Sequence, residues 1–473
     1  MRKTKIICTI GPATDNEDVM RRLMLSGMNV ARFNFSHADP EVDKRRFDMI
    51  AKLREELGLP IATMLDTKGP EIRLKKFKDN APVVINDGDI FTLTSRDVVG
   101  TNEIASISFA GLPRDVDIGS KILINDGLVE LQVEKLNATD ITCRVIHGGK
   151  LSNHKGINVP GVDLSLPYIS EADMTDLEFG AQTGFDFIAA SFVRSAADVN
   201  YLRKFTHSLG WNNVKIIAKI ENRDGVNNID EILEAADGIM VARGDMGVEI
   251  PFEQIPAIQK SLISKGYNAG KQVITATQML ESMINNPRPT RAEITDIANA
   301  IYDGTSAIML SGETAAGHFP VETVQTMARI AECTESDIDY AENLLHLGDR
   351  PNSSVTDAIS HATVTTALDL NAAAIITVTK SGNTAKMISK YRPQCDIIGL
   401  TPDPTTCRQM NLSWGVRPAL IGEMSTTDEL IAAALKAAKN NGFVNTGDTV
   451  VITAGVPLGV SGNTNLLEVE TIS

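Results

Sequence analysis

Short apolar runs alternate along this chain with segments that carry helix signals. Eight such runs occur within the first 311 residues, at 5–10, 29–34, 61–66, 186–192, 214–221, 238–243, 272–277 and 307–311. Strands that are apolar on both faces are typical of parallel sheets covered by helices. Eight strand–helix units therefore predict a closed (β/α)8 barrel of the TIM type, in which functional residues gather at the carboxyl ends of the strands.

Helix signals fill the intervals between these runs. Residues 15–26 and 40–57 carry apolar side chains at helical spacing, and Thr290 followed by Glu293 forms a capping box that begins a helix over 292–302. We therefore assign residues 1–69 and 167–344 to the barrel.

One strand–helix unit is interrupted by residues 70–166, whose pattern is different. Asn86-Asp-Gly88 and Asn125-Asp-Gly127 are hairpin signals. Val129, Leu131 and Val133 alternate with polar residues, as on a half-exposed strand. We expect 70–166 to form a small β-barrel domain inserted over the mouth of the large barrel.

The last part of the chain returns to an α/β pattern. Strand-like runs at 374–379, 396–400, 416–420 and 449–453 alternate with helical segments, the longest at 427–440. This pattern predicts a C-terminal domain, 345–473, built on an open α/β sheet.

Charge and composition exclude several classes of protein. The net charge of −15, from 45 basic and 60 acidic residues, disfavours non-specific binding to nucleic acid or to an anionic membrane. No apolar run approaches the roughly 18 residues of a membrane span, and the first ten residues lack the pattern of a signal peptide. The five cysteines form no C-x-x-C pair, which favours free thiols and a cytoplasmic location.

Charged side chains follow the apolar part of several predicted strands. Arg32 shares a strand face with Asn34 and Ser36, and Lys219 shares one with Glu221. Gly244-Asp245 and Thr277 also follow such strands, as does Ser311-Gly-Glu313. Each of these sites taken alone fits a solvated strand end, a local salt bridge or a capped turn.

Together these residues predict a site for an anionic substrate. Glu221 and Asp245 on neighbouring strands suit Mg²⁺ or Mn²⁺. The oxygens of Asn34, Ser36, Asp66 and Thr67 suit a monovalent cation, and Arg73 adds a second guanidinium that suits phosphate. The site lacks a Ser-His or Cys-His pair, so covalent acyl chemistry is not expected.

The chain resembles a known family along essentially its whole length. The motifs resemble those of the pyruvate kinases and occur in the same order: Cys8-Thr-Ile-Gly-Pro12, Arg32-Phe-Asn-Phe-Ser-His37, Leu65-Asp-Thr-Lys-Gly-Pro-Glu-Ile-Arg73, Ile217-Ala-Lys-Ile-Glu-Asn222, Ala242-Arg-Gly-Asp245, Thr275-Ala-Thr-Gln-Met279, Pro287-Arg-Pro-Thr-Arg-Ala-Glu293 and Leu310-Ser-Gly-Glu-Thr314. The resemblance implies a cytoplasmic homotetramer that transfers phosphate from phosphoenolpyruvate to ADP, giving pyruvate and ATP, with Mg²⁺ (or Mn²⁺) and K⁺ as cofactors.

The resemblance also implies roles for individual residues. It places Arg32, Lys219, Gly244, Asp245 and Thr277 on the substrate, with Lys219, Arg32 and Thr277 acting in catalysis. It assigns Glu221 and Asp245 to Mg²⁺, and Asn34, Ser36, Asp66 and Thr67 to K⁺. It places Asn34, Arg73 and Lys155 on the nucleotide. Family members that dispense with K⁺ carry a lysine where Glu71 stands here.

A hydroxyl-rich loop after the first C-terminal strand resembles the effector loop of the family. Hydroxyls and free backbone N–H groups at a helix N-terminus favour an anion, although a capped helix without a ligand is the alternative. The residues expected to bind a phosphorylated allosteric effector are Thr379, Ser381, Gly382, Asn383 and Thr384, with a second loop at 453–463 folding over them.

The residues of the predicted site leave two other functions open. A metal-dependent lyase or mutase acting on a similar acid would need no nucleotide site, no β lid and no monovalent-cation cluster. A metabolite sensor without catalytic activity would be expected to have lost Lys219 or a metal-binding carboxylate, and this chain keeps both.

Overall fold

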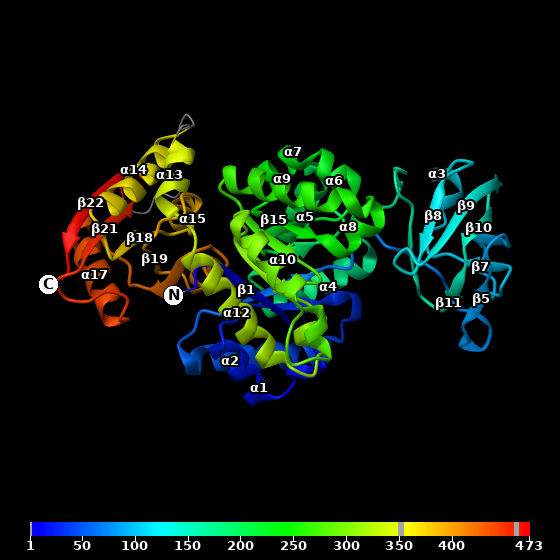
Figure 1. Ribbon diagram of the computed structural model, residues 1–473, viewed down its shortest axis with the longest axis horizontal. Helices are drawn as coiled ribbons and strands as arrows, with labels where there is room; N and C mark the ends of the chain where they lie inside the picture. The colour runs from blue at the N-terminus through cyan, green and yellow to red at the C-terminus, as the bar shows by residue number, and fades with distance from the viewer. Residues whose placement is uncertain (1, 349–353, 458–462) are drawn as a thin grey trace.

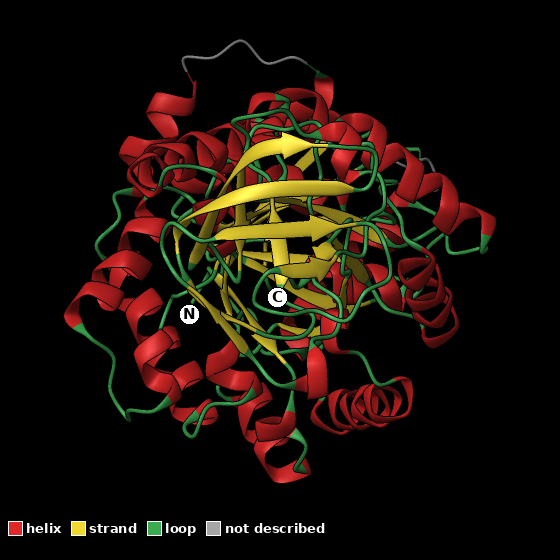
Figure 2. Ribbon diagram, turned by 90° about the vertical axis from the view of Figure 1, so that its right-hand side faces the viewer, coloured by secondary structure: helices red, strands yellow, loops and turns green. Residues whose placement is uncertain are grey.

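A computed structural model describes residues 2–348, 354–457 and 463–473, and it forms three lobes in a row (Figure 1). The barrel is the middle lobe, the inserted β lobe lies at one end and the C-terminal domain at the other. Viewed along the long axis, the strands lie near the centre with helices around them (Figure 2).

Eight parallel strands close the barrel in the order β1-β17-β16-β15-β14-β13-β3-β2, which confirms the predicted fold class. Each strand lies within one of the eight apolar runs, because burial on both faces favours apolar residues at most positions. The strands are β1 (Lys5–Thr9), β2 (Val30–Asn34), β3 (Ala62–Asp66), β13 (Phe187–Ala190), β14 (Lys215–Ile220), β15 (Gly238–Ala242), β16 (Gln272–Ala276) and β17 (Ala307–Leu310).

Helices surround the barrel, and local signals set their ends. Asp39 caps the longest, α2, whose last turn is followed by Gly58 at φ 62°, a conformation that favours glycine. The Thr290–Glu293 capping box begins α10 as predicted. These helices are α1 (Glu17–Leu25), α2 (Pro40–Leu57), α4 (Glu171–Thr183), α5 (Ala196–Ser208), α6 (Arg223–Asn227), α7 (Ile229–Ala235), α8 (Arg243–Glu249), α9 (Ile255–Asn268), α10 (Arg291–Tyr302), α11 (Gly312–Ala315) and α12 (Pro320–Ser336).

The β lobe is a seven-stranded sheet with a separate two-stranded sheet, β11-β5. Its edge strands β4 and β7 are joined by an isolated bridge from Leu74 to Ile107, so the sheet curls into a small barrel. Its elements are β4 (Ile72–Arg73), β5 (Val83–Ile85), β6 (Ile90–Thr94), β7 (Ile104–Ser106), α3 (Leu112–Asp115), β8 (Lys121–Ile124), β9 (Val129–Leu136), β10 (Asp140–His147), β11 (Gly149–Leu151) and β12 (Gly156–Asn158).

One of the two predicted hairpins in this lobe is wrong. Residues 125–127 connect β8 to its antiparallel partner β9, as expected. Residues 86–88 form a turn, but the flanking strands β5 and β6 pair with β11 and β10 instead of each other. An Asn-Asp-Gly sequence fixes the local turn, whereas the pairing of its flanks depends on strands elsewhere in the sheet.

The C-terminal domain is a five-stranded sheet in the order β20-β19-β18-β21-β22, flanked by helices. Four parallel strands match the predicted runs, and the antiparallel edge strand β22 was not predicted. The elements are α13 (Tyr340–Gly348), α14 (Val355–Asp369), β18 (Ala374–Val378), α15 (Asn383–Lys390), β19 (Asp396–Thr401), α16 (Pro404–Met410), β20 (Val416–Leu420), α17 (Thr427–Asn440), β21 (Thr449–Ala454) and β22 (Leu466–Thr471).

The C-terminal domain packs against the amino ends of the barrel strands. The Gln409 side chain donates to the backbone oxygens of Asp186 and Asn213, at 3.0 and 2.8 Å. Gln272 at the start of β16 donates to the Ser413 hydroxyl at 2.9 Å. The carboxyl ends of the strands are therefore left to face the β lobe.

Two further properties bear on function. None of the helices among the described residues is both long enough and apolar enough to cross a membrane. All five cysteines are free thiols, and Cys8, Cys143 and Cys407 are buried.

Candidate active site

A buried ionic network joins three neighbouring parts of the barrel mouth. Asp66, at the end of β3, accepts from Arg32 Nε at 2.6 Å and from Lys219 Nζ at 3.0 Å. All three side chains are at least nine-tenths buried. Burial alone would raise the pKa of Asp66, but Arg32 and Lys219 outweigh burial and lower it. The carboxylate is therefore ionised, and it holds two cations where substrate phosphate is expected.

Lys219 also contacts the second carboxylate of the network. Its ammonium lies 2.9 Å from Glu221 Oε1. Burial alone would lower the pKa of Lys219, but the charges of Asp66 and Glu221 outweigh burial and raise this pKa. The alternation expected from the sequence is confirmed, since both side chains point to the same side of the strand end. A permanently charged lysine at this position can stabilise negative charge on a bound group.

Glu221 is fully buried and incompletely satisfied. Its Oε2 accepts from the backbone N–H of Phe192 at 2.7 Å, whereas Oε1 makes no hydrogen bond of proper geometry despite the nearby ammonium. The pKa of Glu221 is raised to about 8, chiefly by burial and also by repulsion from Asp245. Such a carboxylate has a free ligand position and needs a further cation to stay ionised at neutral pH, which fits a divalent metal.

Asp245 lies in the first turn of α8 and is exposed, so it remains open to water and ligands. Among the described residues, no group of three or more His, Cys, Asp or Glu side chains lies together as a complete metal site. A metal held by Glu221 and Asp245 would therefore keep positions for oxygens that the protein does not supply.

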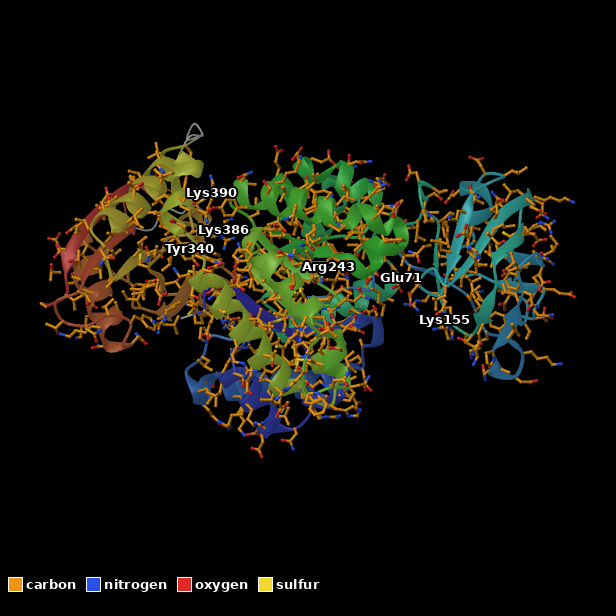
Figure 3. The ribbon with its side chains drawn as sticks, viewed as in Figure 1. Glu71, Lys155, Arg243, Tyr340, Lys386 and Lys390 are labelled. Carbon is orange, nitrogen blue, oxygen red and sulfur yellow. The ribbon has the colours of Figure 1, made fainter. Side chains whose placement is uncertain are left out.

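Thr277 sits beside Gly244 in an unusual conformation. Its φ is 75°, which is rare for a β-branched residue, and a Cβ on Gly244 would lie 2.8 Å from its Cγ2. Arg243, labelled in Figure 3, donates to the backbone oxygens of Ala276 and Thr277 at 3.1 and 2.5 Å. Gly244 is thus required by close approach, and Arg243 holds the strained turn in place.

The four oxygen-bearing residues expected to bind a monovalent cation come from two paired strand ends. Asn34 and Asp66 are register partners on β2 and β3. Ser36 follows in a 3₁₀ turn and donates its backbone N–H to Asn34 Oδ1 at 3.2 Å, while the Thr67 hydroxyl accepts from Ser191 N at 3.1 Å. The donor set is entirely oxygen, as a hard cation requires.

Two of the three residues expected to reach the nucleotide, Arg73 and Lys155, lie on the β lobe, away from the buried network, whereas Asn34 ends β2 of the barrel. Arg73 is paired with Glu71, at 2.8 Å from Nε to Oε2, and donates to the His154 backbone oxygen. Lys155 is half-buried, and its ammonium has no hydrogen-bond or ion-pair partner in the described parts of the chain. Figure 3 shows Glu71 and Lys155 toward the β lobe, on the side of the barrel mouth.

The expected effector residues lie together at the start of α15 in the C-terminal domain. Gly382 has φ 79° and caps the helix without a side-chain bond. The Thr379 hydroxyl accepts from Gly382 N at 3.1 Å, and the Thr384 hydroxyl bonds to that of Thr464 at 2.9 Å. Part of the second loop, 458–462, lies outside the described residues.

Sequence reasoning missed Ser191, which is central to the network. Its hydroxyl receives a hydrogen bond from Lys219 Nζ at 2.7 Å and lies 3.3 Å from Asp66 Oδ1. The signal was present, because Ser191 directly follows β13, one of the eight predicted strands, at its carboxyl end. Glu313, which follows β17, accepts the backbone N–H groups of Leu280 and Ser311.

Comparison with known proteins agrees with the fold. The family model for the pyruvate kinase barrel domain matches residues 1–324, and that for the pyruvate kinase alpha/beta domain matches 357–470. Pyruvate kinase of Geobacillus stearothermophilus is 50% identical over all of this chain and 81% of its own length. That of Clostridium acetobutylicum is 47% identical over the full length of both. A crystal structure of a pyruvate kinase from Cryptosporidium parvum aligns with TM-score 0.93 at 40% identity, covering 100% of this chain and 96% of the other.

A (β/α)8 barrel whose mouth combines buried cations with carboxylates suits a phosphotransferase, because such cations stabilise the charge of a transferred phosphoryl group. The matches extend over both the barrel and the C-terminal domain. The chain belongs to the pyruvate kinase family. It is a metal-dependent enzyme of glycolysis that uses phosphoenolpyruvate and ADP and yields pyruvate and ATP.

Proposed function

We propose that this enzyme uses Mg²⁺, held by Glu221 and Asp245, together with K⁺, held by Asn34, Ser36, Asp66 and Thr67. The observation that carries the metal assignment is the buried Glu221 oxygen that lacks a hydrogen bond. When bound, the divalent ion would neutralise charge on substrate oxygens. The direct test is pyruvate formation from phosphoenolpyruvate and ADP, coupled to lactate dehydrogenase, in the presence and absence of each cation.

The protein residues provide the remaining stabilisation. Arg32, held by Asp66 and by the Thr9 hydroxyl at 2.9 Å, is fixed in a position to bind the phosphoryl group. Lys219 would offset charge that develops on the transferred group and on the enolate oxygen. Thr277 would face the enolate carbon, and the backbone at Gly244 would contact the substrate carboxylate. Arg73, Asn34 and Lys155 would bind the nucleotide.

The monovalent cation should be required for activity, and Glu71 should determine that requirement. Glu71 is a carboxylate paired with Arg73, so the local charge does not replace a cation. We expect little activity in tetramethylammonium chloride compared with KCl. Glu71→Lys should retain activity without K⁺, whereas the control Glu71→Gln should still need it. Equal activity of the wild type in both salts would contradict this assignment.

The β lobe, 70–166 in our division, should act as a lid. Two chain crossings join it to the barrel, and Asn158 donates to Glu249 of α8 at 2.8 Å. Closure would bring Arg73 and Lys155 to the phosphates and exclude water. We expect small-angle scattering to show a smaller radius of gyration with Mg²⁺, K⁺ and the product analogue oxalate. An unchanged lobe orientation in scattering and in crystals with and without oxalate would argue against a lid.

The loop at Thr379–Thr384 should bind a phosphorylated effector and regulate a homotetramer in the cytoplasm. The Gly382 cap leaves backbone N–H groups of α15 without a side-chain acceptor, which supports an anion there. A sugar phosphate or AMP should shift the phosphoenolpyruvate saturation curve of the wild type. The Thr379→Ala/Ser381→Ala/Thr384→Ala variant should not respond. An identical response by this variant would show that the loop is a helix start without a ligand.

A further inference from the structure

Ser191 lies between two functional groups of the barrel mouth. Its strand, β13, is the middle one of the trio β3-β13-β14 and pairs in parallel with both neighbours. The paired part of β13 ends at Ala190, so Ser191 follows at the level of Lys219 on β14. On the other side, β3 ends at Asp66 and continues into Thr67. The register of the barrel therefore places Ser191 between two oxygen donors of the expected cation site and the ammonium of Lys219.

Ser191 holds both oxygens of Thr67. The backbone N–H of Ser191 donates to Thr67 Oγ1 at 3.1 Å, and its hydroxyl donates to the Thr67 backbone oxygen at 2.7 Å. The backbone N–H of Thr67 in turn donates to the backbone oxygen of Ala189 at 3.0 Å. These three hydrogen bonds attach Thr67 to the end of β13, so Ser191 orients whichever oxygen of Thr67 binds a cation.

The same hydroxyl also contacts Lys219. It accepts from Lys219 Nζ at 2.7 Å, while that ammonium lies 3.0 Å from Asp66 Oδ1 and 2.9 Å from Glu221 Oε1. An ammonium has three donors, and Ser191 is its neutral partner beside two carboxylates. The hydroxyl has one proton, and its distance of 2.7 Å to the Thr67 oxygen is shorter than the 3.3 Å to Asp66 Oδ1. A chain of two hydrogen bonds thus runs from Lys219 through Ser191 to Thr67.

This chain of hydrogen bonds is buried and tightly packed. Ser191 is 2% exposed, Thr67 7% and Lys219 8%. A Cβ on Gly69 would lie 2.8 Å from the Ser191 Cβ, so the segment after Thr67 packs closely against the serine. Buried hydrogen bonds are electrostatically stronger than those in water and polarise one another along a chain. A change in the orientation of Thr67 is therefore transmitted to the Lys219 ammonium.

We propose, on the basis of the K⁺ site proposed above, that Ser191 is a positioning residue that couples this site to Lys219. With Thr67 fixed by its part in the cation site, the Ser191 hydroxyl is held toward Lys219, and the ammonium is aligned before substrate binds. When the cation site is empty, Thr67 can turn, and Lys219 loses that alignment. Ser191 would act through Lys219, without touching the substrate itself.

Cation binding measured without turnover is the first test. The melting temperature of the full chain is compared in KCl and in tetramethylammonium chloride at equal ionic strength, without substrate. K⁺ should raise the melting temperature of the wild type, because it binds the folded state. In Ser191→Ala the K⁺ concentration for half of this rise should increase about 3- to 10-fold, the effect of losing one neutral hydrogen bond. The control Ser195→Ala, which removes an α5 N-cap hydroxyl that makes no cap hydrogen bond, should respond as the wild type does.

Steady-state kinetics, measured well below the melting temperature of each variant, is the second test. At saturating K⁺, Ser191→Ala should lower turnover about 10-fold, the lower range for losing a hydrogen bond to a charged group. The KM for phosphoenolpyruvate should change much less, because Lys219 acts mainly on charge that develops in the transition state. Without K⁺, Lys219 is already misaligned and the substitution should cost little, so the ratio of turnover in the two salts should shrink.

These measurements separate the coupling from the cation site itself. Equal melting temperatures and equal activities of the wild type in both salts would refute the K⁺ site and the coupling together. A wild type that needs K⁺, with a Ser191→Ala variant that only melts lower and keeps its turnover and its K⁺ response, would refute the coupling and leave the K⁺ site standing. Loss of turnover alone, or weaker K⁺ binding alone, would also overturn the coupling, because Ser191 would then act at one of the two sites only.

Discussion

Lys219→Met is expected to lower turnover by about 10²- to 10³-fold, the cost of removing one preorganised charged donor. The KM for phosphoenolpyruvate should change much less, because the charge that Lys219 offsets develops mainly in the transition state. The ammonium lies 3.0 Å from Asp66 Oδ1 and 2.9 Å from Glu221 Oε1, so it is fixed before substrate arrives. The measurement is steady-state kinetics at saturating Mg²⁺ and K⁺.

The substitution also leaves the buried, ionised Asp66 carboxylate without one of its two cations. We therefore expect a lower melting temperature, and activity should be measured well below it. Lys204→Met, an exposed lysine of α5, is the matched control and should behave as wild type. A variant whose KM rises in proportion while turnover is preserved would show that Lys219 binds substrate without acting on the transition state.

Glu221→Gln is expected to weaken binding of Mn²⁺, used as a paramagnetic probe in place of Mg²⁺, by at least about tenfold. Turnover should fall with it, and higher metal concentration should restore it in part. Glutamine has the shape of a protonated glutamate, and burial already raises the pKa of Glu221 to about 8. Without metal at pH 7, the variant should therefore be as stable as the wild type.

Asp245→Asn should also weaken Mn²⁺ binding and lower turnover, because Asp245 is the second carboxylate proposed to hold the divalent ion. Asp230→Asn changes an exposed carboxylate paired with Lys265 on the outside of the barrel and serves as the control. Electron paramagnetic resonance measures free Mn²⁺ directly, so the readout does not depend on activity. Normal Mn²⁺ affinity in both Glu221→Gln and Asp245→Asn would rule out this metal site.

Much of the candidate site could be located from the sequence because strand geometry is local. Lys219 lies on β14 and Glu221 directly follows that strand, so their spacing of two residues predicts that both side chains point to the same side, where they form an ion pair. The eight apolar runs likewise gave strand positions that agree with the closed barrel. Asn34 and Asp66 ended on neighbouring strands, as the order of the first units predicts.

Contacts between distant parts of the chain were not accessible in this way. Ser191 reaches Asp66 across 125 positions of sequence, and Arg243 fixes the backbone of Thr277 from the next strand end. The turn at 86–88 was recognised, but its flanking strands found other partners. Arg73 is expected to bind phosphate, yet its guanidinium is paired with the carboxylate of Glu71 in this structure.

By itself, the sequence determined the succession of strands and helices in the barrel, the end of each barrel strand that carries charge and the residue types available there. It could do so because periodicity, capping and turn formation act over a few neighbouring residues. The tertiary structure decided which charges meet and how deeply they are buried. These depend on distances between atoms far apart in the chain, and the raised pKa of Glu221 arises from that packing.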